Sequence, residues 1–148
     1  MSGVTDKVVL VTGAASGLGL ADAQVLIEQG AQVIMTDIEA DRGSELAAQF
    51  GAMFLPQDVA DEPRWAEIMD AVKAEYGRLD GIVNNAGIAP IADIETTTTD
   101  MWRKTLAIHL DGTYFGCQAA IKLMKESGGG SIVNMSSTAA LVGIPDYL

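Results

Sequence analysis

The chain has 148 residues, of which 49% are hydrophobic, and carries 20 acidic against 9 basic side chains, a formal net charge of −11 at pH 7. This length suffices for one domain with a buried core, and the apolar content excludes a disordered or collagen-like chain. The acidic excess repels polyanions, so we expect no nucleic acid partner. The single cysteine, Cys117, excludes an intramolecular disulfide and favours a reducing compartment.

The longest apolar runs are too short to cross a bilayer, and the first residues lack the basic-then-apolar order of a secretory signal. We therefore expect a soluble cytoplasmic protein without a membrane partner. The chain has one histidine, His109, and no clustered Cys, His or Glu partners near it in the sequence. One such ligand does not make a metal site, so we expect no bound metal.

Short apolar runs alternate with helical periods along the chain. The expected strands span residues 7–12, 31–36, 52–55, 79–83 and 131–135, and the expected helices span 18–29, 39–50, 65–76 and 101–125. This alternation predicts an α/β fold: one domain, residues 1–148, with a doubly wound parallel sheet covered by helices on both faces. Thr97 and Asp100 have the spacing of a capping box before the long last helix.

A glycine-rich loop, Thr12-Gly-Ala-Ala-Ser-Gly-Leu-Gly19, lies between the first expected strand and the first expected helix. Glycines there let backbone amides approach a pyrophosphate at the positive end of the helix dipole, although a tight turn would also use them. Asp37 ends the second strand, 18 residues after Gly19. An acid at that distance accepts hydrogen bonds from the adenosine ribose hydroxyls, or serves as a helix N-cap.

The glycine loop has the spacing TGxxxGxG, and three further motifs follow it in order. They are Asp58-Val59 after the third strand, Asn84-Asn85-Ala86-Gly87 after the fourth, and residues 130–137 (GSIVNMSS) at the fifth. Together they resemble the classical type of the short-chain dehydrogenase/reductase family, specifically its N-terminal part. The resemblance implies a Rossmann-type fold truncated after the fifth strand, and we expect the native chain to continue beyond Leu148.

The family resemblance implies a role for each motif. Ser137 would be the catalytic serine that hydrogen-bonds the substrate oxygen. Strand alternation lets only one of Ser136 and Ser137 face the cleft, and the spacing of the family motif selects Ser137. The Asn84–Gly87 segment would border the ribose, although it also reads as a strand-terminal turn. The cofactor-binding residues implied are Gly13, Ser16, Gly17, Leu18, Gly19, Asp37, Asp58, Val59, Asn85, Ala86 and Gly87.

Two departures from the family pattern affect the chemistry. The family's acid–base tyrosine and its lysine, in the pattern S-x12-Y-x3-K, would lie beyond Leu148, so we expect the 148-residue segment alone to be inactive. Tyr147 is ten residues after Ser137 and is interpreted as a loop residue. His109 stands where the family has an asparagine that orders a catalytic water. Its ring either serves that water or is a half-buried helix histidine bonded to a backbone carbonyl.

The resemblance implies reversible hydride transfer between a nicotinamide cofactor and a secondary alcohol or ketone, in a homotetramer that packs through the long helix. We expect NAD(H), not NADP(H), because the Asp37 carboxylate repels a 2′-phosphate and the next residues are Ile-Glu-Ala. Two alternatives remain at this point: a non-catalytic dinucleotide-binding module, and a flavodoxin-like domain.

Overall fold

The computed structural model describes residues 3–143, so the interpretation of Tyr147 lies outside the described residues. The strands are β1 (Val8–Thr12), β2 (Gln32–Asp37), β3 (Met53–Pro56), β4 (Gly81–Asn84) and β5 (Ser131–Asn134). The main helices are α1 (Gly17–Glu28), α2 (Ala40–Phe50), α3 (Glu62–Tyr76), α4 (Thr99–Leu106) and α5 (Gly112–Glu126). Within that part of the chain, none of these helices combines the length and apolarity that a membrane span requires.

The five strands form one parallel sheet in the order β3-β2-β1-β4-β5. The predicted doubly wound α/β fold is therefore confirmed. Because the chain leaves β3 at one edge and re-enters the sheet beside β1, the strand order reverses between β1 and β4. In open α/β sheets, ligands bind at the carboxyl ends of the strands beside this reversal.

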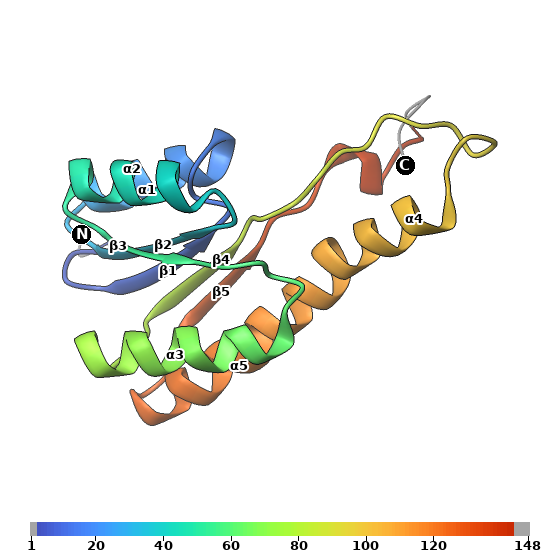
Figure 1. The fold of residues 1–148 in the computed structure, drawn as a ribbon. Helices are drawn as coiled ribbons and strands as arrows, with labels where there is room; N and C mark the ends of the chain where they lie inside the picture. Colours follow the sequence, from blue (N-terminus) through green and yellow to red (C-terminus); the bar gives the residue numbers. More distant parts are fainter. Residues whose placement is uncertain (1–2, 144–148) are drawn as a thin grey trace.

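The helices lie on both faces of the sheet, with α1 and α2 on one face and α3 and α5 on the other (Figure 1). Each face has its own apolar core. On the α3–α5 side, Leu10, Ile34 and Ile82 pack with Trp65 and Ile68. Burying each such side chain contributes about 1.5–3 kcal/mol. Because both faces of the sheet are covered by a core, the central strand β1 is apolar on both of its sides.

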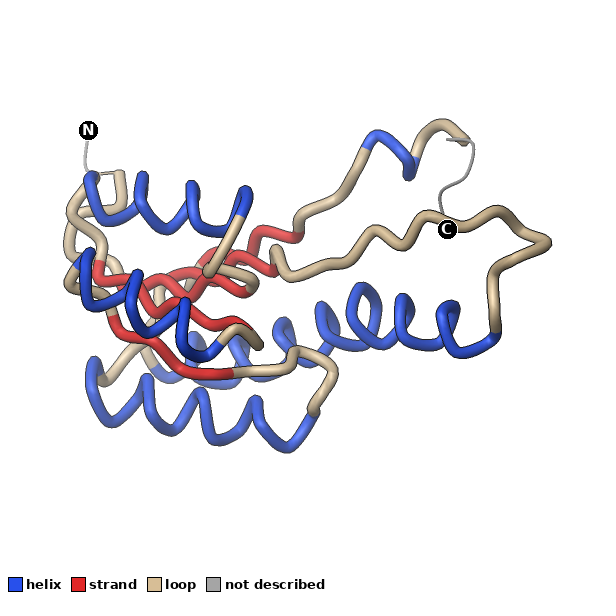
Figure 2. The backbone as a smooth tube through the Cα atoms, turned by 45° about the horizontal axis from the view of Figure 1, so that its top comes forward, coloured by secondary structure: helices blue, strands red, loops and turns tan. Residues whose placement is uncertain are grey.

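The region around β5 is far less buried. No described helix covers β5 on the α1–α2 side of the sheet (Figures 1 and 2). Val133 of β5 is 47% exposed, whereas Leu10 and Val11 of β1 are fully buried. The segment that follows β4 and the segment that follows β5 both extend past the sheet, together with α4 (Figure 2).

The predicted helix over residues 101–125 is interrupted in the structure. A π-helical turn, η1 (Ala107–Asp111), separates α4 from α5 and contains His109. The predicted capping box is wrong by one residue. The N-cap is Thr98, whose hydroxyl accepts a hydrogen bond from Met101 N at 3.2 Å, while the Thr97 hydroxyl donates to the carbonyl of Asp93.

Candidate functional site

A cavity of about 640 Å³ lies at the carboxyl ends of β1, β2 and β4. It is lined by Gly13, Ser16, Gly17, Leu18, Asp37, Ile38, Glu39, Gln57, Asp58, Val59, Asn85, Ala86, Gly87, Ile88, Ala89, Lys104, Ile108 and His109. Ten of the eleven residues predicted to contact a cofactor are in this lining. The eleventh, Gly19, is buried behind the glycine loop.

The glycine loop is compact because two of its positions leave no room for a side chain. Gly13 has φ +66°, and a Cβ added there would lie 2.9 Å from Ala86 Cα. A Cβ on Gly19 would collide with the carbonyl of Gly13 and with Asn85 Nδ2. The loop therefore packs directly against the segment after β4, a contact that the sequence did not predict.

Helix α1 presents its amino terminus to the cavity. Its N-cap, Ser16, has extended backbone angles and makes no side-chain capping bond, and the first turn contains no acidic residue. Helices α2, α3 and α4 each carry an acidic residue in the first turn. The terminus of α1 therefore has no carboxylate in its first turn that would compete with an anion for its N–H groups.

Asp37 joins the glycine loop to the end of β2. Its Oδ2 accepts a hydrogen bond from Ala15 N at 2.9 Å, and its Oδ1 accepts one from Glu39 N at 3.0 Å. Helix α2 begins at Ala40 with Glu39 as N-cap, so Asp37 is not that helix's N-cap. A carboxylate has about four acceptor positions, which leaves capacity for two further donors at the cavity.

Thr12 and Asn85 connect the ends of β1 and β4. The buried hydroxyl of Thr12 accepts hydrogen bonds from Asn85 N and Ala86 N, each at 3.0 Å. Asn85 Nδ2 donates to the carbonyl of Thr12 at 2.9 Å. The Asn-Asn-Ala-Gly segment is thus held against β1 by its own amide groups, which fixes one wall of the cavity.

Asp58 and Val59 line the cavity from the loop after β3. Asp58 is exposed, and its Oδ1 accepts a hydrogen bond from Ala60 N at 2.9 Å. Val59 is buried, and its carbonyl accepts a hydrogen bond from Trp65 Nε1 at 2.9 Å. A ligand at this wall would therefore meet the Asp58 carboxylate, while the Val59 carbonyl already has a protein partner.

His109 contacts the segment after β4. Its Nε2 lies 3.1 Å from Ile88 N and 2.7 Å from Ile88 O. The ring packs on Gly87, where an added Cβ would lie 2.7 Å from the imidazole Cε1. The backbone contact agrees with the second interpretation of His109 given above, although the residue is exposed and not half-buried.

Ser137 does not line this cavity. It is exposed and is the N-cap of a short 3-10 helix, where its Oγ accepts a hydrogen bond from Ala139 N at 3.2 Å. Strand β5 ends at Asn134, so Ser136 and Ser137 both follow the strand. The alternation argument for choosing between them was therefore wrong, because alternation holds only within a strand.

Sequence reasoning missed several lining residues, namely Ile38, Glu39, Gln57, Ile88, Ala89, Lys104 and Ile108. Ile38 is 70% exposed and directly follows Asp37, so its position next to a predicted ligand residue could have indicated it. Gln57 is buried, and neither of its amide atoms has a hydrogen-bond partner within the described residues. The neighbouring sequence does not indicate that the Gln57 side chain is buried, because its burial depends on how β3 packs in the sheet.

The clearest carboxylate pKa shift near the sheet lies at its opposite end. Burial raises the pKa of Asp80, but hydrogen bonds from Arg78, Val8 N and Lys7 outweigh that effect and bring it below its usual value. Asp80 precedes β4 and lies away from the cavity lining. Its charge therefore serves the pairing of β1 with β4 and not a ligand.

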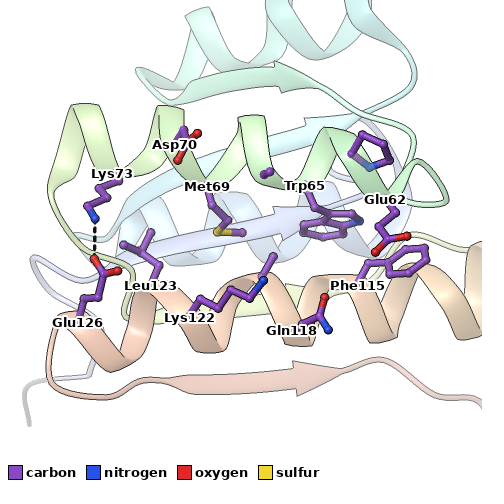
Figure 3. Close-up of a pocket in the computed structure, with 13 residues that line it drawn as sticks. Glu62, Trp65, Met69, Asp70, Lys73, Phe115, Gln118, Lys122, Leu123 and Glu126 are labelled. Carbon is purple, nitrogen blue, oxygen red and sulfur yellow. Dashed lines mark hydrogen bonds and ion pairs between the residues drawn. The ribbon is translucent and has the colours of Figure 1, made fainter.

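A second cavity of about 450 Å³ lies between α3 and α5 (Figure 3). Trp65, Met69 and Leu123 form its apolar floor, and Lys73 closes one end through an ion pair with Glu126 at 2.6 Å. The Lys73 ammonium has its pKa raised by this hydrogen bond. The motifs found in the sequence do not reach this cavity, so it is not part of the candidate site.

The comparisons with known proteins identify the family. A family model described as short chain dehydrogenase matches residues 7–148. The NADP-dependent (R)-specific alcohol dehydrogenase of Lentilactobacillus kefiri is 42% identical over 144 residues, which are 94% of this chain and 57% of that protein. The D-threitol dehydrogenase of Mycolicibacterium smegmatis is 45% identical over 147 residues, 96% of this chain and 56% of that protein.

A crystal structure of a proposed short-chain alcohol dehydrogenase from Sinorhizobium meliloti 1021 superimposes with a TM-score of 0.92 at 34% identity. The superposition covers 99% of this chain and 60% of the Sinorhizobium meliloti chain. The sheet order and the helices on both faces define a fold of the Rossmann type. More specifically, the chain belongs to the short-chain dehydrogenase/reductase family and spans a little over half the length of the relatives it matches.

Proposed function

We propose that this chain is the cofactor-binding part of an NAD(H)-dependent short-chain dehydrogenase, which transfers hydride reversibly between the nicotinamide and a secondary alcohol or ketone. The observation that carries the proposal is the convergence of an acid-free α1 terminus and the Asp37 carboxylate on one cavity. The α1 terminus would bind the pyrophosphate, and Asp37 the adenosine ribose. A bound nicotinamide would supply the hydride carrier, and the protein would orient it.

The preference for NAD(H) rests on the charges beside Asp37. Both of its carboxylate oxygens accept backbone N–H groups, and its neighbours in the lining are Ile38 and Glu39. A 2′-phosphate would meet two carboxylates there. Lys104 also lines the cavity, but it comes from α4 and is remote in sequence from Asp37. One similar protein is named as NADP-dependent, so this preference needs a direct test.

Calorimetric titration of the 148-residue protein with NAD⁺ and NADP⁺ provides that test. We expect NAD⁺ to bind at least about tenfold more tightly, equivalent to about 1.4 kcal/mol. Asp37→Ala should abolish this preference, while Asp41→Ala, which removes the same charge from the first turn of α2, should keep it. Equal affinity of the unmodified protein for both cofactors would refute NAD(H) selectivity, and binding of neither would refute the cofactor site.

The flavodoxin-like alternative is wrong. A flavodoxin-like sheet has the order 2-1-3-4-5, whereas this sheet has the Rossmann order 3-2-1-4-5. The non-catalytic alternative differs from the proposal in chemistry and not in fold. The two are separated by assaying NAD⁺-linked oxidation of secondary alcohols with protein made from the whole reading frame in which this sequence lies. Turnover that requires Ser137 would support the enzyme, and binding without turnover would support the module.

We also propose that copies of the protein associate through α4 and α5 into a homotetramer. Trp102, Leu110, Tyr114 and Ile121 are 41–62% exposed and fall on one face of the helix once the extra residue of the π-helical turn is counted. An exposed apolar stripe of this kind is typical of subunit interfaces. Replacing Tyr114 and Ile121 by lysine should shift the mass in solution, measured by light scattering, towards that of a monomer.

A further inference from the structure

His109 is the feature of the site whose geometry the proposed function leaves unexplained. One ring nitrogen, Nε2, lies within hydrogen-bond distance of both the N–H and the C=O of Ile88. An unprotonated Nε2 can only accept from the N–H, and a protonated Nε2 can only donate to the carbonyl oxygen. The two bonds are therefore mutually exclusive, and the charge and tautomer of the ring select between them.

Three observations tie this choice to the cavity. Gly87, Ile88 and His109 all line it. The ring packs on Gly87 closely enough that a Cβ there would lie 2.7 Å from Cε1. His109 also sits in the π-helical turn between α4 and α5. Such turns are rare and often occur at functional sites, because they re-aim one side chain out of a helix.

We propose that His109 is a positioning residue for the cofactor: its protonated ring holds the carbonyl of Ile88 through Nε2, and its deprotonation changes the backbone group that it holds. The shorter of the two distances, 2.7 Å to Ile88 O, corresponds to the donating form. The inference rests on the proposed function only where it concerns the dinucleotide. The contact between the ring and Ile88 stands without it.

The direction of the effect follows from charge. The other charged side chains lining the cavity are Asp37 at the end of β2, Glu39 directly after it, Asp58 after β3 and Lys104 on α4. Asp111 shares the π-helical turn with His109. Carboxylates and lysine ordinarily keep their charge between about pH 6 and about pH 8, where histidine titrates. Protonation of the ring would add a cation beside a mainly acidic wall and would favour an anionic dinucleotide.

The first experiment uses the protein without cofactor. Because His109 is the only histidine, its ring nitrogens give a single, unambiguous set of signals in long-range ¹H–¹⁵N spectra. We expect the Nε2 signal and the backbone amide of Ile88, labelled through isoleucine, to change together across the histidine titration. An Ile88 amide that stays constant while the ring titrates would overturn the proposal, whether or not the protein binds a cofactor.

The second experiment compares NAD⁺ affinities at about pH 6 and about pH 8, a range in which histidine changes its charge. The unmodified protein should bind about threefold more tightly at the lower pH, a change on the scale of one modest hydrogen bond. His109→Asn should bind equally at both, since an amide supplies a donor and an acceptor together and does not titrate. His109→Phe keeps an aromatic ring on Gly87 but should bind about tenfold more weakly at both pH values.

Thermal melts establish whether the variants fold. If His109→Phe does not fold, the pH dependence of NAD⁺ binding by His109→Asn tests the positioning role. Unchanged affinity in His109→Phe, or the same pH dependence in His109→Asn as in the unmodified protein, would overturn the positioning role. Failure of all forms to bind NAD⁺ would refute the proposed cofactor and the cofactor-positioning role, and the ring–Ile88 contact would still be decided by the spectra.

Discussion

The carboxyl ends of β1 and β5 carry the two halves of the predicted site, and they are built very differently. At the end of β1, the buried Thr12 hydroxyl accepts backbone N–H groups of the segment after β4, and the glycine loop packs against that segment with no room for a Cβ at Gly13. At the end of β5, Ser137 is exposed, and its hydroxyl and its carbonyl accept only local hydrogen bonds, from Ala139 N and Ala140 N. The wall of the cavity is thus formed by contacts inside residues 3–143, whereas the predicted catalytic serine makes only local contacts there.

The largest expected loss of stability at the carboxyl end of β1 comes from a substitution at Gly19. In Gly19→Ala the new Cβ would meet backbone atoms of Gly13 and the Asn85 amide, which cannot move without opening the loop. We expect a loss of about 3 kcal/mol or more in the free energy of unfolding, the upper range for overpacking, together with loss of NAD⁺ binding. Urea unfolding followed by tryptophan fluorescence measures the first quantity.

Gly17→Ala is the matched control for that prediction. Gly17 has φ +54°, but nothing lies within 4 Å of the position of an added Cβ. Only the backbone penalty applies, and we expect a loss of about 1 kcal/mol. If both alanine variants lose the same stability, the close approach of the loop to the segment after β4 does not determine the cost.

Thr12 and Thr36 allow a finer test, because they are buried partners on adjacent strands. The Thr12 hydroxyl accepts the N–H groups of Asn85 and Ala86, so Thr12→Val leaves two donors without an acceptor and should cost about 2 kcal/mol. The Thr36 hydroxyl has no partner within the described residues, so Thr36→Val should be neutral or stabilising by up to about 1 kcal/mol. Denaturant melts measure both variants. Equal losses in the free energy of unfolding for Thr12→Val and Thr36→Val would contradict the prediction.

Asp80 makes the amino end of β1 sensitive to acid, in contrast to the cavity end. Its carboxylate accepts Val8 N and pairs with Arg78 and Lys7, and its pKa in the folded protein lies below the usual value. The stability that this pairing gives is therefore complete above about pH 4 and is lost as the pH falls through the lowered folded pKa. Asp80→Asn should cost about 1–2 kcal/mol at neutral pH.

The pH dependence provides the check on that prediction. Melting temperatures measured from about pH 7 down to about pH 3, the range in which carboxylates become protonated, should fall less steeply in Asp80→Asn than in the unmodified protein. Asp93→Asn is the comparison variant, because the pKa of Asp93 is also lowered, through its bonds with Thr96, but in an exposed loop. Equal slopes for the Asp80 variant and the unmodified protein would exclude Asp80 as the acid-sensitive group.

The sequence predicted the β1 side well because the evidence for it is local. The evidence consists of glycines at fixed spacing after an apolar run and an acid at the end of the next strand. These features lie within about 25 residues and predict the glycine loop and the carboxylate beside it. The contact of His109 with Ile88 joins residues 21 apart and depends on a π-helical turn. Helical periodicity does not reveal such a turn, because an extra residue leaves the apolar spacing nearly intact on either side.

The errors around the predicted site have the same origin. The capping-box spacing selected Thr97 with Asp100, whereas the N-cap is Thr98, which has Met101 and no acidic residue three positions later. The choice between Ser136 and Ser137 assumed that β5 extends beyond Asn134. Strand ends are set by pairing, and β5 has a neighbour only on its β4 side within the described residues.

The smallest expected effect on stability is at Ser137, which tests the β5 end of the predicted site. Because Ser137 is exposed and its hydroxyl caps only a three-residue 3-10 helix, Ser137→Ala should change the free energy of unfolding by less than about 0.5 kcal/mol. In protein made from the whole reading frame, the same substitution should lower kcat about a hundredfold or more, the usual cost of a lost transition-state hydrogen bond. Ser136→Ala serves as the matched control for both measurements. A stability loss without a rate effect would make Ser137 structural, and equal rate losses for both serines would remove the basis for assigning the role to Ser137.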